Sequence, residues 1–415
     1  MNISVSQKLC VFLPFALGYF LSYLFRVVNA VIAPDLTADL ALNPAQLGLL
    51  TSAYFITFAA FQLPLGVLLD RYGPRRIEAF LLFFAGLGAF VFARSESLAG
   101  LVIGRALIGF GVSSCLMAAF KAFVLWFPQN QWPRINGIQM AAGGLGALTA
   151  TAPVEAMLGI TDWRGVFTIL AGITIVVALI VFWVVPEKTQ DQESSLKDQV
   201  QGIIEVFSSP EFWRIAPLTT ASQAAFLSIQ GLWSGQWLRD VAHLDRAAVA
   251  RVLLWVAVAM IIGFISLGTL AERLSRRGIG PVITSVVGMT LCMTIQLLLI
   301  FEIRSWALPL WILFGFFGTT SIIAYAGLSQ SFPQHLTGRV TTGVNLMVFL
   351  GAFAGQWAIG AIINLWPVAA DGGYAPEGYQ AGFALVFGLQ FISLIWFIFA
   401  GRFKKTKSGY VETTS

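Results

Sequence analysis

Two arginines lie inside long apolar stretches of this chain. Arg26 belongs to the run 9–33 and Arg105 to the run 98–120. A charge at the centre of a bilayer costs at least about 2.5–3.5 kcal/mol, so each arginine needs a partner, a water-filled cavity or a function. A guanidinium can donate two parallel hydrogen bonds to a carboxylate or a phosphate. The two residues, which fall at similar depth, predict a site for a small anion.

Polar and aromatic side chains recur at helical spacing in two of the apolar runs. Four of them share one face of the run that contains Arg26: Tyr19, Ser22, Tyr23 and Asn29. Five share one face of the run 215–238: Gln223, Gln230, Trp233, Ser234 and Trp237. A polar stripe on an apolar helix is expected to face water or substrate. A stripe of aromatic residues often serves only to pack one helix against another, but the two glutamines on this face favour the wall of a cavity. Tyr325 is a weaker candidate for the lining of the same cavity.

Acidic side chains are expected to be absent from the centres of the apolar runs. Glu155, near the end of the run 135–158, is the one candidate for a proton carrier, and the alternative is an interfacial residue. If Glu155 has no such role, the cargo carries the proton, or the protein is a uniporter or an exchanger. The sequence has no metal-ligand spacing, phosphate-binding loop or paired nucleophile and base, so we expect no metal, no cofactor and no enzymatic activity.

The overall composition requires a lipid environment. Hydrophobic residues make up 57% of the 415 residues and charged residues 11%, and the mean hydropathy is +0.80. Because backbone polar groups in lipid must be satisfied within each segment, long apolar runs predict helices. We expect an all-α integral membrane protein with about twelve spans, at 9–33, 46–69, 77–94, 98–120, 135–158, 165–185, 215–238, 251–271, 281–301, 306–328, 341–365 and 382–401.

The longest polar stretch divides these spans six and six. It predicts an N-terminal bundle over 1–186, a linker over 187–214, a C-terminal bundle over 215–401 and a tail over 402–415. Apolar residues recur at helical spacing within the linker, at Leu196, Val200, Ile203, Ile204 and Phe207. They indicate a short helix at the membrane surface, and the alternative is a solvated linker.

The two halves also repeat a charged loop motif. Gly66-x-x-x-Asp70-Arg71-x-Gly73-x-Arg75-Arg76 is matched by Gly268-x-x-x-Glu272-Arg273-x-x-Arg276-Arg277, each after the second span of its half. The matched positions indicate a parallel internal repeat. An acid at the mouth of a bundle can form its contact in only one of two states, so Asp70, Arg71, Arg75, Glu272 and Arg273 are predicted gating residues, and a role only in fixing topology is the alternative.

The loop at Gly66 resembles the signature of the major facilitator superfamily, and Arg105-x-x-x-Gly109-x-Gly111 is similar to that family's second motif. The resemblance implies two pseudo-symmetric six-helix bundles around a central cavity that opens alternately to each side. It also implies that arginines on the first and fourth helices hold anionic cargo, although the second motif leaves open a structural or proton-coupling role for Arg105. The Gly-Pro pair of the family's antiporters is absent from 135–158, which counts against a drug exporter.

The basic residues gather in alternate loops, including those at Arg71 and Arg273, and so predict cytoplasmic termini in a cell inner membrane. Topology thus accounts for the net charge of +5 without a nucleic-acid partner. We expect a monomeric secondary-active permease that takes up a small organic anion or zwitterion, coupled to protons or another ion. The alternatives are a proton-coupled exporter of amphipathic compounds and a membrane sensor that transports nothing.

Overall fold

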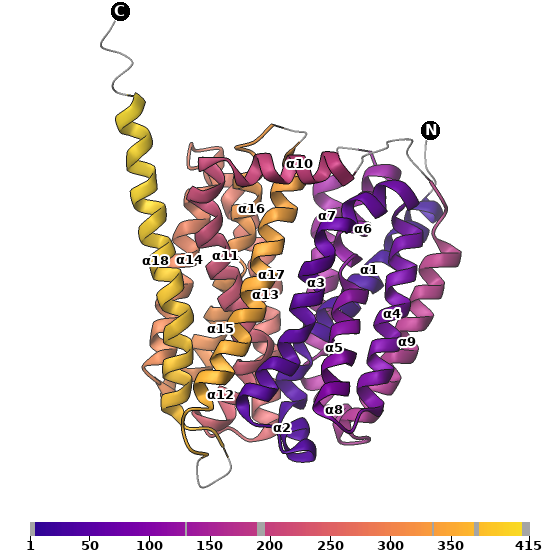
Figure 1. Cartoon of the computed structure of the whole chain (residues 1–415), viewed down its shortest axis with the longest axis vertical. Coiled ribbons are helices and arrows are strands. Elements are labelled where there is room, and N and C mark those ends of the chain that lie inside the picture. The colour runs from indigo at the N-terminus through magenta and orange to yellow at the C-terminus, as the bar shows by residue number, and fades with distance from the viewer. Residues whose placement is uncertain (1–4, 129–130, 189–195, 334–335, 369–372, 409–415) are drawn as a thin grey trace, which may run out of the picture.

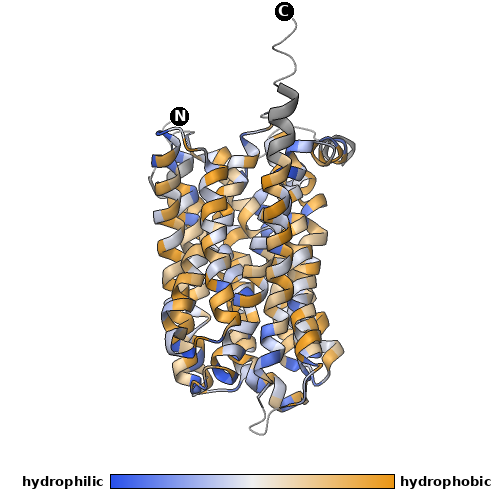
Figure 2. Ribbon diagram, turned by 90° about the vertical axis from the view of Figure 1, so that its left-hand side faces the viewer, coloured by the Kyte–Doolittle hydropathy of each residue, from blue (hydrophilic) through white to orange (hydrophobic). Residues whose placement is uncertain are grey.

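The computed structural model describes residues 5–128, 131–188, 196–333, 336–368 and 373–408. All twelve expected spans are helical, and ten helical segments of the described chain are long and apolar enough to cross a membrane. The other two, expected at 135–158 and 215–238, are interrupted helices. Apolar residues cover the long helices, and hydrophilic residues gather toward their ends (Figure 2). The expected all-α membrane fold is confirmed.

The first half contains α1 (Val5–Val27) with α2 (Asn29–Leu40), α3 (Pro44–Tyr72), α4 (Pro74–Arg94), α5 (Leu98–Val112) with α6 (Cys115–Trp126), α7 (Trp132–Thr149) with α8 (Ala152–Leu158), and α9 (Trp163–Val184). The second half contains α11 (Pro210–Ser228), a π-helical turn (Ile229–Trp233) and α12 (Ser234–Asp240), α13 (Arg246–Ser275), α14 (Pro281–Ile300), a 3-10 turn (Arg304–Trp306) with α15 (Ala307–Gly318) and α16 (Ser321–Ser329), α17 (Thr337–Ile363) and α18 (Pro376–Ser408). Between the halves lies α10 (Leu196–Phe207).

The two halves stand side by side, and α10 crosses one end of the bundle (Figure 1). At this end α1 begins and α18 ends, and we call it the terminal face. The other end, where α2, α8 and α12 lie, is the opposite face. The apolar residues of the linker therefore belong to a helix, α10, that crosses the bundle. The linker residues 189–195 lie outside the described part of the chain.

Two boundaries differ from the sequence prediction. α11 begins at Pro210 rather than at 215, and α18 runs from Pro376 to Ser408 rather than over 382–401. Both helices start at a proline, which suits the first helical turn because that turn leaves its backbone N–H groups unbonded. The expected tail therefore continues α18 as far as Ser408, and residues 409–415 lie outside the described chain.

Hydroxyl side chains interrupt the fourth and tenth spans at corresponding places. Ser113 Oγ donates to the Phe110 carbonyl at 2.7 Å, between α5 and α6. Thr319 and Thr320 donate to the carbonyls of Phe316 and Phe317 at 2.8 and 2.6 Å, between α15 and α16. Hydroxyls that bond back to the preceding turn compete with the helical ladder. Breaks at equivalent places in the two halves agree with the predicted internal repeat.

The glycine of the first-half motif has a conformational role. Gly73 ends α3 with φ 79°, and Pro74 begins α4 immediately afterwards. A positive φ is readily adopted only by glycine, and proline suits the first position of a helix. The motif therefore reverses the chain within a single residue and holds its charges at the terminal face.

The halves meet most closely at the opposite face. In addition to the long contact between α3 and α17, α2 packs against α12 and α8 against α13. A side chain at Gly235 of α12 would collide with the Ala30 carbonyl of α2, and one at Gly360 of α17 with the Pro44 carbonyl of α3. Such close backbone approach requires glycine, so the described chain is closed at this face.

Candidate functional site

A cavity of about 260 Å³ lies between the two halves. It is bounded by α1, α3, α5, α6 and α7 from the first half and by α11, α16 and α17 from the second. Its polar lining residues are Tyr19, Ser22, Tyr23, Arg26, Gln62, Ser113, Gln223, Tyr325, Thr341 and Asn345. Apolar side chains such as Phe58, Met117 and Phe349 make up most of the remaining wall. None of the described residues that line the cavity is acidic.

The cavity is approached from the terminal face. Phe120 and Thr341, which lie toward that face, are partly exposed, whereas Arg26 deeper in the cavity is 7% exposed. Beyond Arg26 the close contact of Gly235 with Ala30 separates the cavity from the opposite face. The cavity is therefore a pocket with its cationic end at the middle of the bundle.

Arg26 lies among aromatic rings. Its guanidinium carbon is 4.4 Å from the ring centre of Tyr23, 5.3 Å from that of Phe349 and 5.6 Å from that of Phe58. Its Nε has no hydrogen-bond partner, and none of the described carboxylates forms an ion pair with it. Ring faces attract a cation but do not cancel its charge. Arg26 thus presents an uncompensated positive charge to a cavity without acids.

Arg105 lies outside the cavity lining. It is 1% exposed, and its Nη1 donates a 2.8 Å hydrogen bond to the carbonyl of Phe25. The helix breaks at Val28, between α1 and α2, and Arg105 satisfies a carbonyl next to this break. Both arginines approach the Tyr54 ring, at 5.3 Å for Arg105 and 6.0 Å for Arg26. In this conformation Arg105 supports the segment that carries Arg26, which agrees with the structural alternative for its motif.

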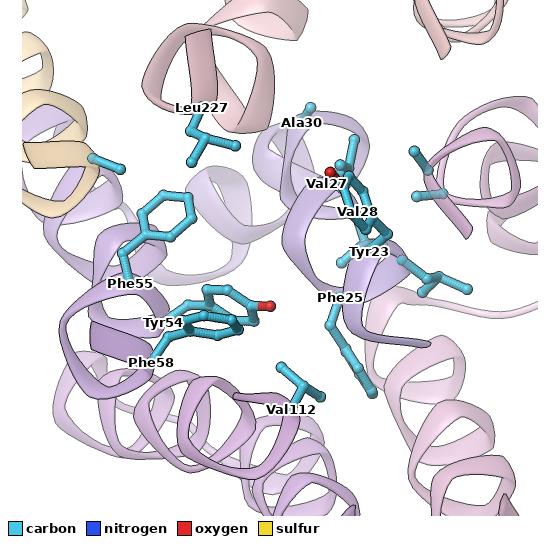
Figure 3. Close-up of a cluster of buried hydrophobic side chains, with 14 of the residues drawn as sticks. Tyr23, Phe25, Val27, Val28, Ala30, Tyr54, Phe55, Phe58, Val112 and Leu227 are labelled. Carbon is cyan, nitrogen blue, oxygen red and sulfur yellow. The ribbon is translucent and has the colours of Figure 1, made fainter. Parts of the chain in front are cut away.

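The polar stripe around Arg26 is divided by depth. Tyr19 and Tyr23 line the cavity with their rings 5.2 Å apart, and the Tyr19 hydroxyl lies 3.6 Å from the Met140 sulfur. Asn29 is fully buried beyond them, and its amide donates to Thr51 at 3.0 Å. Figure 3 shows Tyr54 and Phe58 lying together on α3 and pointing toward α1. The stripe therefore supplies two tyrosines and Ser22 to the cavity, and one asparagine to the contact between α2 and α3.

The second half gives the cavity fewer residues than the sequence predicts. Gln223 lines it and bonds to Ser321, and Tyr325 lines it from α16. Gln230, Trp233 and Trp237 do not line it. Trp233 donates to the Gln356 carbonyl at 3.0 Å, and Trp237 packs against Trp311 with ring centres 5.6 Å apart. The π-helical turn at Ile229–Trp233 shifts the helical register, which separates these residues from the face of Gln223.

The charges of the first-half motif bond to α6 and to the start of the linker. Asp70 Oδ1 accepts from Lys121 of α6 at 2.7 Å, and Arg75 lies 3.8 Å from Glu187. Arg71 lies over the ring of Tyr72 at 5.3 Å. In the second half Glu272 pairs with Arg276 at 2.6 Å, and both are exposed, as is Arg273. The first motif therefore ties α3 to α6, whereas the second forms only a pair along α13.

Arg246 connects the two halves at the opposite face. It pairs with Asp35 of α2 at 2.6 Å and with Glu155 of α8 at 2.6 Å, and we call these three residues the Arg246 cluster. The side chain of Arg246 is 42% exposed, so water and salt reach the cluster. Glu155, the predicted proton carrier, is thus placed in a contact between halves and outside the cavity lining.

Arg246→Ala should loosen the contact between the halves at the opposite face. Partly exposed ion pairs contribute about 0.2–1 kcal/mol each, so we expect the loss of two pairs to lower the ratio of closed to open protein by about two- to thirtyfold. Spin labels at Ile160 and Ala247, in a variant without the native cysteines, would report the distance across this face. The change should be smaller at high salt, because salt already weakens the wild-type contact. Equal distance distributions in the parent and the variant at low salt would contradict this role.

Trp163 and Arg164 form a comparable polar contact within the first half. Trp163 Nε1 and Arg164 Nη1 both donate to Asp39, at 2.8 and 2.6 Å. These hydrogen bonds, with Trp163 the stronger cause, lower the pKa of Asp39 below its ordinary value. A lowered pKa means that the contact stabilises the fold at neutral pH and is lost as the pH falls through that value. It joins the end of α2 to the start of α9.

Two features of the interior were not predicted from the sequence. The aromatic rings around Arg26 come from Phe58 and Phe349, which are far apart in the chain. Glu78 is fully buried, although the apolar runs led us to expect no acid in the interior. It is the fifth residue of α4, and its place near the start of an apolar run made it resemble an interfacial charge. The sequence carried no signal of this burial, because Gly18, which makes room for the carboxyl group, lies 60 residues away on α1.

Comparison with known proteins agrees with this architecture. The family model of the Major Facilitator Superfamily matches residues 15–356. A bacterial homolog of the human lysosomal transporter Spinster, solved in an inward-facing and unoccupied conformation, superimposes with a TM-score of 0.77 at 17% identity, covering 97% of this chain and 98% of that chain. At this identity the likeness concerns the fold alone.

Two curated relatives match parts of the chain. The probable sulfoacetate transporter SauU of Cupriavidus necator is 28% identical over 159 residues, which are 38% of this chain and 37% of that protein. The hexuronate transporter of Bacillus subtilis is 30% identical over 190 residues, 45% of this chain and 44% of that protein. The chain thus aligns with less than half the length of either relative. The family match, which agrees with the twelve helical spans and the central cavity, shows that this chain belongs to the major facilitator superfamily.

Proposed function

We propose that this transporter is a secondary-active permease that takes up a small organic anion or zwitterion bearing a carboxylate. The observation that carries the proposal is Arg26, a buried cation at the end of a cavity whose described lining contains no acid. A buried charge without a counterion is costly, and an anionic ligand removes that cost when it binds. Without a ligand, the charge of Arg26 therefore favours the binding of a carboxylate.

The remaining polar groups suit the rest of such a molecule. Gln223 and Asn345 offer amides, and Tyr325 offers a hydroxyl, all on the side of the cavity formed by the second half. The cavity volume of about 260 Å³ lies below the roughly 300–1,000 Å³ typical of drug-sized ligands. We therefore assign carboxylate binding to Arg26 and recognition of the remainder to the second half.

The named relatives support an anionic cargo. A hexuronate transporter and a probable sulfoacetate transporter are, by their names, carriers of organic anions. Their similarity to this chain covers less than half of each protein, so it supports the class of cargo and not its identity.

We place the terminal face in the cytoplasm of a cell with an inner membrane. That face carries Arg71, Arg75 and Arg76 in one half and Arg273 and Arg276 in the other, as the positive-inside rule requires of a cytoplasmic side. With this orientation the cavity opens inward, and the closed opposite face is the outer gate. The transporter acts as a monomer in this proposal, because each polypeptide has both halves and encloses its own cavity.

A second candidate is a proton-coupled exporter of amphipathic compounds. The observation that favours it is the predominantly apolar wall, to which Leu116, Met117, Phe120, Leu227 and Val348 belong. An apolar cargo, however, would leave Arg26 without a counterion. We therefore rank it below the anion permease.

Counterflow in proteoliposomes distinguishes these functions. Vesicles preloaded with one member of a panel of carboxylates, sulfonates or amphipathic cations are tested for accelerated uptake of the same labelled compound. We expect a carboxylate to be exchanged at least about tenfold faster than its neutral amide, since a hydrogen bond to a charged group is worth about 1.5–3 kcal/mol. Exchange of amphipathic cations alone would favour the exporter. Ligand-induced thermal stabilisation without any flux would indicate a sensor.

A further inference from the structure

Glu78 is a buried acid to which the transport site described above assigns no role. Its side chain is 0% exposed, and neither carboxylate oxygen has a hydrogen-bond partner in the described chain. Gly18 of α1 lies directly against Oε1, so closely that a methyl group on Gly18 would collide with that oxygen. Glycine at position 18 therefore leaves room for the carboxyl group between α4 and α1.

The surroundings of Glu78 disfavour a negative charge. Of the helices packed against α4, α6 contributes Cys115, which is near enough to interact electrostatically with Glu78. The charged groups of the neighbouring helices are Asp70 and Arg71 of α3, Arg105 of α5, Lys121 of α6, Arg164 of α9, and Lys8 and Arg26 of α1, and none of them bonds to the carboxyl oxygens of Glu78. An ionised carboxylate without water, cation or hydrogen-bond donor is so costly that the group keeps its proton. Glu78 is therefore neutral in this conformation.

The position of Glu78 connects it to the cavity. It touches α1 at Gly18, next to Tyr19, and it lies near α6 at Cys115, next to Leu116. Tyr19 and Leu116 both line the cavity, so Glu78 lies directly behind the wall that these two helices form. Gly18 and Arg26 are eight residues apart on α1, a rise of about 12 Å. One helix thus carries the proposed anion site and covers the acid.

We propose that Glu78 is the proton-binding site through which this transporter couples anion uptake to proton entry. This inference rests on the proposed function, because it requires an anion at Arg26. The carboxylate of Glu78 takes up one proton from the outer side, forming a single O–H bond, and α1 closes over the neutral acid. The same O–H bond breaks when water reaches Glu78 from the inner side, and the proton leaves to that side.

The charges explain why the two ligands bind together. An ionised Glu78 would repel an anion on Arg26, and protonation removes that repulsion. Two charges about 12 Å apart at an effective dielectric constant of about 20 change an affinity about tenfold. Coupling of this kind is reciprocal, so a bound anion also favours protonation of Glu78. The affinity for the anion should therefore fall about tenfold as the pH rises through the titration of Glu78.

The test compares exchange with accumulation in Glu78→Gln, whose neutral amide imitates the protonated acid. Proteoliposomes are assayed for counterflow of an anion that the parent exchanges, at equal pH on both sides. They are then assayed for accumulation of that anion driven by an alkaline interior. We expect counterflow within about twofold of the parent and accumulation reduced at least about tenfold. Glu96→Gln, at an exposed acid of the same half, should retain both.

The outcomes separate this inference from the proposed function. If the parent exchanges no anion, the proposed function is wrong and the coupling with it. If the parent exchanges an anion and Glu78→Gln still accumulates it like the parent, Glu78 is not the coupling site. If the parent accumulates the anion equally with and without the pH gradient, Glu78 is likewise not a site of proton coupling.

A second variant keeps the inference testable if Glu78→Gln does not fold. In Gly18→Ala the added methyl group displaces the flexible end of the Glu78 side chain from its place between α4 and α1, which admits water to the carboxylate and stabilises its charged form. The midpoint of the pH dependence of anion affinity, measured by ligand-induced thermal stabilisation, should move to lower pH. An unchanged midpoint would contradict the proposal. Cys115→Ala should leave the midpoint in place, which separates Glu78 from its titratable neighbour.

Discussion

Arg26→Ala should lower the exchange of a recognised carboxylate about 100-fold. Removing one partner of a buried, hydrogen-bonded charge pair costs about 2–5 kcal/mol, and 100-fold corresponds to about 2.7 kcal/mol. The loss should appear in kcat/KM for counterflow in proteoliposomes. Folding should survive, because the substitution removes an uncompensated buried charge rather than creating one. A melting temperature close to that of the parent would confirm that the substitution affects transport and not folding.

Two further variants show whether the guanidinium itself is needed. Arg26→Lys keeps the charge but loses the planar pair of donors and the stacking on Tyr23 and Phe349, so we expect an intermediate loss of about tenfold. Arg94→Ala removes an exposed arginine at the end of α4 and should exchange the anion like the parent. Exchange by Arg26→Ala at the rate of the parent would show that the anion binds elsewhere.

Gly235→Val should hold the opposite face open. A side chain at this position collides with the Ala30 carbonyl, and both residues belong to rigid helices of different halves. Overpacking costs about 1–3 kcal/mol, which shifts the equilibrium between the two faces roughly 5–150-fold. The strain is relieved when the halves separate, so the variant should populate a state that is open on this side.

The distance between spin labels at Ile160 and Ala247 measures this shift. We expect a longer mean distance between the labels in Gly235→Val than in the parent. Exchange should fall at least about tenfold, because the variant rarely reaches the state in which the opposite face is closed. Gly172→Val is the matched control, since a side chain at Gly172 meets no other atom within 4 Å. A parental distance in Gly235→Val would mean that the close contact does not control closure of this face.

The site was predicted less completely than the fold. Periodicity placed Arg26, Tyr19 and Tyr23 on one helical face, and the structure puts all three in the cavity lining. The same reasoning put Trp233 and Trp237 beside Gln223, but a π-helical turn changes the register between them. Such a turn depends on what the helix packs against, and its residues carry no marker that a spacing rule can detect.

The two arginines illustrate a related limit. Both were predicted from the cost of a charge in an apolar run, and both are buried. Their different surroundings follow from neighbours distant in the chain, because Arg105 meets the Phe25 carbonyl and Arg26 meets Phe349. The cost of burial identifies a residue that needs a partner, but only the packing of helices identifies the partner.

The sequence by itself determined the membrane-spanning helices, the repeat of two halves and the presence of charges that need compensation. Each of these depends on local hydrophobicity or on short motifs, which are complete within one segment of chain. The tertiary structure alone decided which buried charge faces the cavity, that Glu155 connects the halves through Arg246, and that Glu78 is covered by Gly18. These properties depend on the distance between helices and on access to water, and both arise only when the halves pack together.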